Sequence, residues 1–418
     1  MLRASLQRLR GPGGGWHARM QPISCSTRSG GLGLGAGVRD HAAADRSRVN
    51  ILHMRNSLVN GNESIDLNNF QGRTLTWYSC GPTVYDDSHL GHARTYICTD
   101  IIRRILQHFF KLDVHYAMGV TDVDDKIIQR AREDGCIGGV SPADVVRVAR
   151  THEESFMADM DALNVLRPDS ILRVTEHMDD IVLYVEKLVR DGKAYESADG
   201  VYFDTAQLGD TYGKFGVKAG GPGTADDFDL NVDADHEEPF SGKRHWRDFA
   251  LWKKAKDGEP SWGSPWGPGR PGWHIECSAM THATFGSSLD VHSGGIDLKF
   301  PHHTNEIAQC EAHGCCDDDW VKHWIHTGHL YIKGSKMSKS LKNFVSIQEF
   351  LRGNLSPRPA VDLRLFFLSH KYHSSLHFSP DRVHEAGALR QKLCTFLHSV
   401  ESIMSSWGAK STHHRRRP

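Results

Sequence analysis

The 418-residue chain has no apolar run near the length of about 18 residues that a membrane-spanning helix needs. It has almost no charge imbalance, because 50 Lys and Arg residues oppose 51 Asp and Glu residues, and this excludes a uniformly basic nucleic-acid coat. Its 9 cysteines are irregularly spaced and form no C-x-x-C pair, which argues against a disulfide framework. Histidine, with 27 residues, is plentiful. We therefore expect a soluble globular protein of two or three domains, without a membrane partner, in a reducing compartment.

The first 39 residues contain six arginines, four serines and no acidic residue. Leu2, Leu6 and Leu9 fall on one helical face. An Arg-rich, acid-poor amphipathic start is typical of a mitochondrial transit peptide, and a Gly/Arg leader without an address is the alternative. We exclude residues 1–48 from the fold and expect the protein in the mitochondrial matrix.

Strand-like and helix-like segments follow in an order that predicts a parallel α/β sheet. The expected strands are 74–79, 114–120, 289–293 and 321–330, and the expected helices are 95–110, 142–160, 175–191, 347–351, 360–369 and 380–404. Two helices in succession predict a largely helical insert at about 136–245. Its residues 219–242 hold seven acidic residues and no Lys or Arg, which is typical of a solvated loop.

Two short motifs have the composition of phosphate-binding sites. His89-Leu90-Gly91-His92 lies at an expected helix start, where imidazoles and the helix dipole favour an anion, although helix capping explains such histidines as well. Lys336-Met337-Ser338-Lys339-Ser340 suits a mobile loop that places ammonium groups on a polyphosphate, although an exposed charged loop has the same composition. Both motifs in this order are more specific than either alone.

Two further groups of residues give weaker indications of a functional site. Cys80, Cys277, His302 and Glu306 offer donors that suit zinc, but their spacing alone does not bring them together, and buried cysteines with a capping histidine are the alternative. Asp122, Asp124 and Asp125 follow a strand, where they would face a ribose or a metal, or else Asp122 caps the next helix.

With these residues assembled, the chain resembles the class I aminoacyl-tRNA synthetases, and within them the cysteinyl-tRNA synthetases of the mitochondrial type. The resemblance runs from about Trp77 to about Phe378. It is carried by residues 78–86, 89–92 as the HIGH-type signature, 119–126, 271–278, 292–298, 300–309, and 336–340 as the KMSKS signature.

The resemblance implies a Rossmann-type parallel-sheet catalytic domain at 49–345 that contains the insert, a short helical stem-contact-like region at 346–405 and a basic tail at 406–418. An anticodon-binding domain like that of the family is not expected, so a shortened product is predicted. Two residues depart from the family pattern. Leu90 stands where the HIGH signature has Ile, and Thr304 stands where the family often has Glu.

The resemblance also implies a site. Its zinc ligands would be Cys80, Cys277, His302 and Glu306, with the thiolate of the substrate cysteine joining them. The residues that contact the substrate cysteine would be Gly81, Thr121, Trp273 and His302.

The implied activity is ATP-dependent ligation of L-cysteine to tRNA(Cys) through cysteinyl-adenylate, in mitochondrial translation, with one Zn²⁺ per chain and Mg²⁺ on ATP. A monomer is favoured. The catalytic residues would be His89, His92, Lys336 and Lys339, and ATP would contact His89, Gly91, His92 and Lys339.

Three alternatives stay open. One is an ATP-dependent cysteine ligase acting on a small amine, and another is a truncated zinc-binding fragment that does not charge tRNA. The third is persulfide formation with pyridoxal phosphate on Lys126 or Lys339, for which the sequence has no independent signal.

Overall fold

The computed structural model describes residues 51–59, 61–135, 139–215, 242–314, 319–332, 334–337 and 343–413, with side chains up to residue 406. The predicted leader, most of the acidic segment 219–242 and Lys339 lie outside the described residues, as does the end of the predicted tail. No helix among the described residues is long and apolar enough to cross a membrane.

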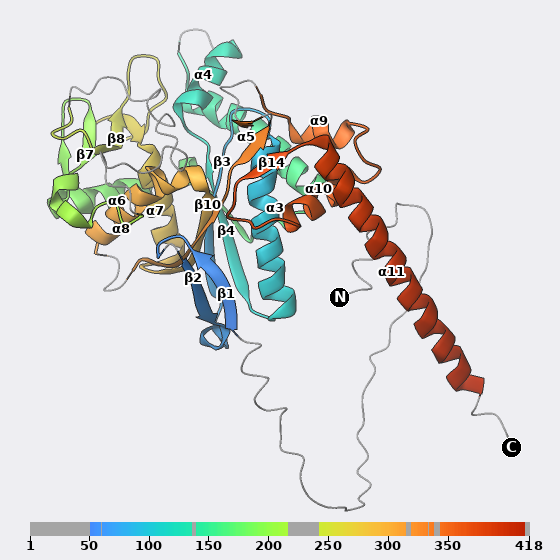
Figure 1. Cartoon of the computed structure of the whole chain (residues 1–418). Helices are drawn as coiled ribbons and strands as arrows, with labels where there is room; N and C mark the ends of the chain where they lie inside the picture. The colour runs from blue at the N-terminus through green and yellow to red at the C-terminus, as the bar shows by residue number, and fades with distance from the viewer. Residues whose placement is uncertain are drawn as a thin grey trace, which may run out of the picture. The chain divides into compact units, whose positions relative to one another are not determined.

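A five-stranded parallel sheet in the order β11-β10-β3-β4-β5 forms the centre of the molecule (Figure 1). Its strands are β3 (Leu75–Thr83), β4 (Val114–Thr121), β5 (Ser170–Arg173), β10 (Leu289–Gly295) and β11 (Val321–Thr327). Four of them confirm the strands expected from the sequence, and β5 was not expected. All five strands run in one direction, so their carboxyl ends lie at one edge, where ligands of open α/β sheets bind.

Helices cover both faces of this sheet and bury two apolar clusters. One cluster joins the sheet to α3 (Leu90–Arg104), α9 (Ile347–Arg352) and α10 (Pro359–Leu368). The other joins it to α4 (Asp125–Glu133), α6 (Met178–Arg190), α7 (Trp273–Phe285) and α8 (His302–Ala312). The long helix α5 (Pro142–Ala162) contributes to both. This layering matches the Rossmann-type α/β fold that was predicted.

The segment between β4 and α7 contains more sheet than the sequence predicted. After α6 come β6 (Ala194–Glu196), β7 (Gly200–Phe203), β8 (Phe249–Lys254) and β9 (Gly269–Pro271), which pair as one antiparallel sheet. The strands are short, and β7 is buried along its whole length, so its sequence shows no alternation of apolar and polar residues. The predicted insert at about 136–245 is largely helical, because α5 and α6 are its longest elements, and β8 and β9 lie beyond its predicted end.

A helical region follows the central sheet, as expected. A small sheet of β13 (Ser335–Lys336), β12 (Leu330–Ile332) and β14 (Leu376–Phe378) lies beside α9 and α10, and α11 (Pro380–His413) continues nine residues beyond the predicted end at residue 404. A hairpin of β1 (Ile51–Asn56) and β2 (Gly61–Asp66) precedes β3.

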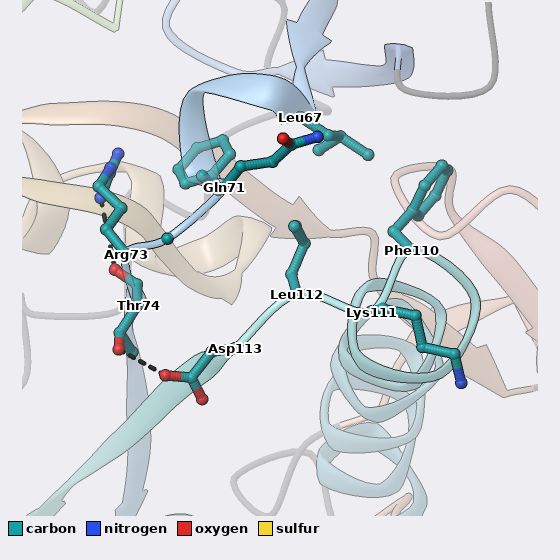
Figure 2. A pocket seen from close by; sticks show the side chains of 10 residues that line it. Leu67, Gln71, Arg73, Thr74, Phe110, Lys111, Leu112 and Asp113 are labelled. Atoms are coloured by element: carbon teal, nitrogen blue, oxygen red, sulfur yellow. Dashed lines mark hydrogen bonds between the residues drawn. The ribbon is translucent and has the colours of Figure 1, made fainter. Parts of the chain in front are cut away.

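A cavity of about 570 Å³ lies where β3 and β4 begin (Figure 2). Its lining comes from residues 67, 70–74 and 110–113, which directly precede these strands. The predicted site residues Cys80, Gly81 and Thr121 lie at the opposite, carboxyl ends of the same strands. The cavity is therefore separate from the candidate site.

Candidate active site

The candidate site forms where the carboxyl ends of the central strands meet the N-terminal turns of helices α7 and α8. β3 carries Cys80 and Gly81, and β4 ends at Thr121. Helix α7 brings Cys277 within its second turn, and α8 begins at His302. These residues are far apart in the sequence, and the parallel sheet brings them to one edge.

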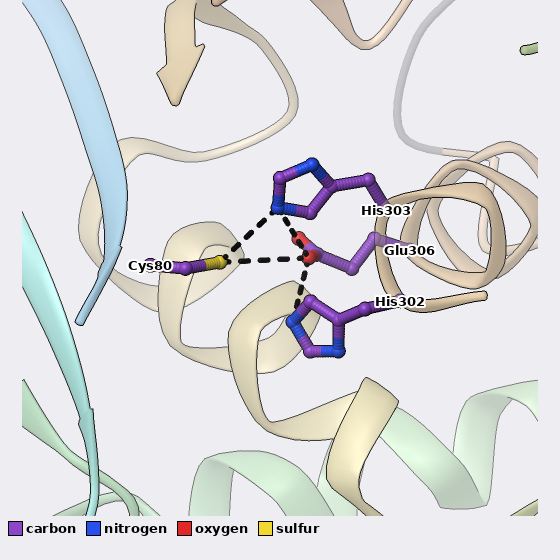
Figure 3. Close-up of side chains that lie close together, drawn as sticks. All are labelled: Cys80, His302, His303 and Glu306. Atoms are coloured by element: carbon purple, nitrogen blue, oxygen red, sulfur yellow. Dashed lines mark hydrogen bonds and ion pairs between the residues drawn. The ribbon is translucent and has the colours of Figure 1, made fainter. Parts of the chain in front are cut away.

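Four donor atoms lie close enough to hold a metal ion. One ligand atom each from Cys80, His302, His303 and Glu306 lies within 4.8 Å of all the others, and all four residues are buried (Figure 3). Cys80 Sγ is 3.4 Å from His303 Nε2 and 3.9 Å from Glu306 Oε1. His302 Nε2 is 3.0 Å from the same carboxylate oxygen. Thiol, imidazole and carboxylate donors in this number suit zinc.

Cys277 belongs to the same cluster. Its Sγ lies 3.8 Å from Cys80 Sγ. Hydrogen bonding with Cys80 and the neighbouring His302 lower the pKa of Cys277 to about 6, although burial opposes this. Burial, together with Cys277 and Glu306, raises the pKa of Cys80 well above its usual value. The pair therefore holds one thiolate near neutral pH, and a thiolate is the form that binds metals.

The carboxylate of Glu306 is fully buried and is compensated by two histidines. Burial alone would raise its pKa, but His292 and His302 lower it to about 2. His292 Nε2 lies 2.9 Å from Glu306 Oε2, on the side away from His302. Glu306 and Cys277 in turn raise the pKa of His302 to about 10 against the effect of burial. The ionised carboxylate is thus fixed by its neighbours.

The sequence analysis missed the histidines that surround these donors. His303 Nδ1 is 2.7 Å from His326 Nε2, and His274 Nδ1 is 3.1 Å from His302 Nδ1. Burial lowers the pKa of His303 and of His326 well below 6.5. Several of the 27 histidines therefore lie in or around this cluster, and the adjacent pair His302-His303 was the one signal of it in the sequence.

The residues predicted to contact the substrate cysteine border this cluster. The ring of Trp273 stacks on that of His302 with 4.5 Å between centroids. Thr121 Oγ1 donates to Glu276 Oε2 over 3.2 Å. A Cβ on Gly81 would lie 2.0 Å from the carbonyl oxygen of Gly119, so β3 and β4 approach each other too closely here for a side chain.

The HIGH-type residues form the start of α3. His89 is its N-cap, and its Nδ1 accepts hydrogen bonds from the backbone N–H of Gly91 and His92 over 3.1 and 3.4 Å. His92 Nδ1 accepts from the N–H of His89, which completes a capping box, and the two rings stack at 3.9 Å. Capping, the alternative reading of the motif, is thus present in the structure. Leu90 is fully buried, so its departure from Ile is accommodated in the core.

Backbone hydrogen bonds join the two signature regions. The N–H of Leu90 donates to the carbonyl of Val345 over 3.0 Å, and the N–H of Ile347 donates to the carbonyl of Ser88 over 3.0 Å. Lys336 lies in β13, and its carbonyl accepts from Asn343 Nδ2 over 2.8 Å. The segment that follows the KMSKS residues is therefore anchored beside the start of α3.

The acidic group after β4 has structural partners. Asp122 accepts from the N–H of Thr175 over 2.9 Å, and Asp124 is the N-cap of α4. The prediction that Asp122 caps this helix is therefore wrong, because the strand ends one residue before Asp122 and turns it toward Thr175. Asp125 pairs with Arg270.

Two other residues singled out from the sequence also have clear surroundings. Lys126, one of the two lysines considered for pyridoxal phosphate, has its Nζ 5.6 Å from the centre of the Tyr85 ring. Thr304, the departure from the family's Glu, donates its hydroxyl to the carbonyl of Lys299 over 2.8 Å.

The region that holds the parallel sheet, the histidine-capped helix start and the thiol-containing cluster also matches a family model. The family described as tRNA synthetases class I (C) catalytic domain matches residues 66–388, and the chain belongs to it. It is thus a class I aminoacyl-tRNA synthetase by family.

The curated relatives that the chain resembles are named cysteine-tRNA ligases. The cytoplasmic cysteine-tRNA ligase of Dictyostelium discoideum is 47% identical over 358 residues, covering 84% of this chain and 52% of the relative. The probable mitochondrial cysteine-tRNA ligase of Xenopus tropicalis is 47% identical over 332 residues, covering 79% and 54%. The chain thus spans about half the length of these relatives. The cysteine-tRNA ligase of Pyrococcus furiosus is 50% identical over 305 residues, covering 73% and 59%.

Solved structures support the fold. Mycobacterium tuberculosis methionyl-tRNA synthetase in complex with methionyl-adenylate has a TM-score of 0.56 and 17% identity, covering 75% of this chain and 67% of that chain. At this identity the likeness concerns the fold alone.

Proposed function

We propose that the protein ligates L-cysteine to tRNA(Cys) through cysteinyl-adenylate. The observation that carries the proposal is the buried cluster of Cys80, Cys277, His302 and Glu306 at the carboxyl edge of a class I catalytic sheet. The names of the relatives, all cysteine-tRNA ligases, agree with it. The amine-ligase and zinc-fragment alternatives would use the same cluster, and the names of the relatives favour tRNA charging over them.

The cluster fits a zinc ion by its donor chemistry. We propose Cys80, Cys277, His302 and Glu306 as ligands of one Zn²⁺, and His303 as a neighbour that His326 holds in place. His303 is closer to Cys80 than Cys277 is, so it is the alternative fourth ligand. When bound, zinc supplies a soft Lewis acid that takes up the substrate's thiolate far better than a serine hydroxyl.

The residues around this cluster would hold the rest of the amino acid. Trp273 stacks on His302 and walls the pocket, while Gly81 and Thr121 flank it at the strand ends. An apolar pocket alone rejects a substrate of nearly the same shape by only about 100-fold. Recognition through the thiol makes stronger selection feasible without an editing site.

The signature residues would act on ATP. A carboxylate oxygen of cysteine attacks the α-phosphorus, the bond to the β-phosphate oxygen breaks, and pyrophosphate leaves. His89, Gly91 and His92 at the start of α3, and Lys336 and Lys339, would contact ATP and stabilise the negative charge that develops on the phosphates. Mg²⁺ is proposed to accompany the phosphates.

The second step transfers cysteine to tRNA. A ribose hydroxyl of the terminal adenosine attacks the carbonyl carbon of the mixed anhydride, and AMP leaves with the bonding electrons. No covalent enzyme intermediate is required. We propose this activity for mitochondrial translation because of the Arg-rich, acid-poor leader composition, and one relative is named mitochondrial whereas others are named cytoplasmic.

Two assays on the purified chain separate the steps of this proposal. Cysteine-dependent ATP–pyrophosphate exchange measures adenylation, and transfer of radiolabelled cysteine to tRNA(Cys) measures charging. We expect exchange without tRNA and charging when tRNA(Cys) is added. Absence of exchange in a zinc-loaded preparation would contradict the proposal, and release of AMP with a small amine in place of tRNA would favour the cysteine ligase alternative.

A further inference from the structure

A buried arginine that the proposed mechanism does not use lies in the second turn of α3. Arg94 follows His92 by two positions and is 2% exposed. Among the described residues no carboxylate pairs with its guanidinium, and its buried Nε has no hydrogen-bond partner. A cation taken out of water is costly unless its partners compensate it. The contacts that the guanidinium does make therefore have to offset this cost.

The partners of the Arg94 guanidinium are backbone carbonyls of the loop between α10 and β14. Its Nη2 donates to the carbonyl of Ser374, and it lies 3.5 Å from the carbonyl oxygen of Lys371 and 3.4 Å from that of Tyr372. The guanidinium carbon is 6.0 Å from the centre of the Phe367 ring, near the end of α10. One buried cation thus holds three consecutive turns of backbone oxygen against α3.

The loop that Arg94 holds leads into the small sheet that contains Lys336. Strand β14 begins at Leu376, two residues after Ser374, and pairs with β12. Strand β12 pairs in turn with β13, where Tyr331 lies opposite Lys336. The path from Arg94 to the first lysine of the KMSKS signature therefore runs through the loop and two strand pairings.

The loop is also fixed to the segment that precedes β12. The N–H of Gly328 donates to the carbonyl of Tyr372 over 2.9 Å, and the N–H of Leu376 donates to the carbonyl of His329 over 2.9 Å. A Cβ on Gly328 would lie 2.4 Å from the carbonyl oxygen of Ser374, so the two backbones are in direct contact. A displacement of the loop would therefore move β12, and β13 with it.

We propose that Arg94 is a positioning residue, which fixes Lys336 relative to the start of α3 by holding residues 371–374. The inference rests on the proposed function, because Lys336 is one of the groups proposed to act on the phosphates of ATP. A displacement of about 1 Å at a reacting centre can cost about 100-fold in rate. Arg94 acts through Lys336 and not on the substrate, so its loss should lower turnover and leave substrate binding in place.

Cysteine-dependent pyrophosphate exchange on variants of Arg94 measures this effect. Arg94→Met keeps the apolar stem and removes the donors, so kcat should fall by roughly tenfold or more while KM for ATP and for cysteine stays near the wild-type value. Arg94→Lys should restore most of kcat, because one nitrogen makes all three carbonyl contacts and an ammonium offers three donors. Arg94→Gln, with a shorter neutral donor, should lose turnover like Arg94→Met, and it replaces that variant if the methionine protein does not fold.

The matched control is Arg103→Met on the same helix. Arg103 is 5% exposed and donates to the carbonyl of Arg167 over 2.7 Å, away from the small sheet. Thermal unfolding on all samples measures how much stability each variant loses. Arg103→Met should lower the unfolding temperature and leave kcat unchanged, which separates loss of a buried arginine from loss of the held loop.

A double-mutant cycle with Lys336→Ala tests whether Arg94 acts through that lysine. In the Lys336→Ala protein, Arg94→Met should lower kcat no further, because the group that it positions is absent. Three results would overturn the inference: full kcat in Arg94→Met, an equal loss of kcat with and without Lys336, and full kcat in Lys336→Ala alone. Each of them leaves exchange by the wild type, and with it the proposed function, intact. Absence of exchange in the zinc-loaded wild type would instead reject the proposed function itself.

Discussion

Two buried carboxylates show how differently the two ends of the candidate active site are built. Glu306 lies among Cys80, His292 and His302, which hold it ionised with a pKa of about 2. Asp159 of α5 is 3% exposed, and burial together with Asp87, two residues before the HIGH-type motif, raises its pKa to about 6. Around Glu306 two histidines outweigh burial, whereas around Asp159 burial and Asp87 outweigh the opposing effects of Gln348 and Arg352. We call these two regions the cysteine end and the nucleotide end, after the ligands proposed for them.

The contacts at the two ends differ in the same way. At the cysteine end, side chains of α7, α8 and β3 contact one another directly. At the nucleotide end, backbone hydrogen bonds join residues 88–90 to 345–347, and the His89-His92 pair caps a helix. Side-chain chemistry thus suits selection of one amino acid, and helix-end geometry suits phosphate binding.

The largest effect is expected from Cys277→Ser at the cysteine end. Loss of a soft thiolate donor should lower zinc content and raise KM for cysteine by roughly 100-fold or more, since even changes outside the ligand set cost 10- to 100-fold. Metal content is measured by atomic absorption and KM by pyrophosphate exchange. Cys310→Ser is the matched control, because Cys310 is buried on α8 and contacts the hydroxyl of Tyr184. Wild-type zinc and KM in Cys277→Ser would remove Cys277 from the proposed ligands and favour His303.

A smaller effect, on turnover alone, is expected from His92→Gln. Glutamine at this position of a capping box still accepts a backbone hydrogen bond, so the cap of α3 should survive. The imidazole is lost, and kcat for pyrophosphate exchange should fall by about 100-fold while the Kd of ATP changes little. If His92 only caps the helix, the variant will exchange at the wild-type rate. Thermal unfolding on the same samples checks that the helix cap is kept.

The smallest effect is expected from Asp159→Asn, and it depends on pH. Because the pKa of folded Asp159, about 6, lies above its ordinary value of 3.8, the folded state binds the proton more tightly. The acid therefore costs stability as the pH rises through this range. The variant should raise the free energy of unfolding at pH 7.5 by about 1–2 kcal/mol and give no gain below pH 4. Urea unfolding at both pH values measures this, and an equal effect at both would show that the charge of Asp159 is already compensated.

The sequence predicted the centre of the fold better than its periphery. Strands β3, β4, β10 and β11 have seven to nine residues and are mostly buried, whereas β5, β6 and β7 have only three or four residues each and gave no periodic signal. Helices α9 to α11 were expected because their apolar residues recur at helical spacing. The domain limits and the leader remain predictions.

The candidate site depended on the family resemblance. Cys80 and Cys277 are 197 positions apart, and Cys80 and Glu306 are 226 apart, so no local spacing could join them. His292 and His326 lie in β10 and β11, where the sequence reads as ordinary buried strand. The N-cap of α4 is Asp124 and not Asp122, because a helix start read from the sequence is uncertain by one or two residues.

The central claim is that a thiol-selecting centre decides which amino acid is activated. The most direct measurement is kcat/KM for pyrophosphate exchange with cysteine and with serine, in zinc-loaded protein and after chelation. The account predicts that cysteine exceeds serine by about 10⁴-fold or more with zinc. It also predicts that cysteine-dependent exchange falls on chelation and returns when zinc is restored. Comparable activation of serine, or cysteine-dependent exchange that is unchanged in metal-free protein, would contradict it.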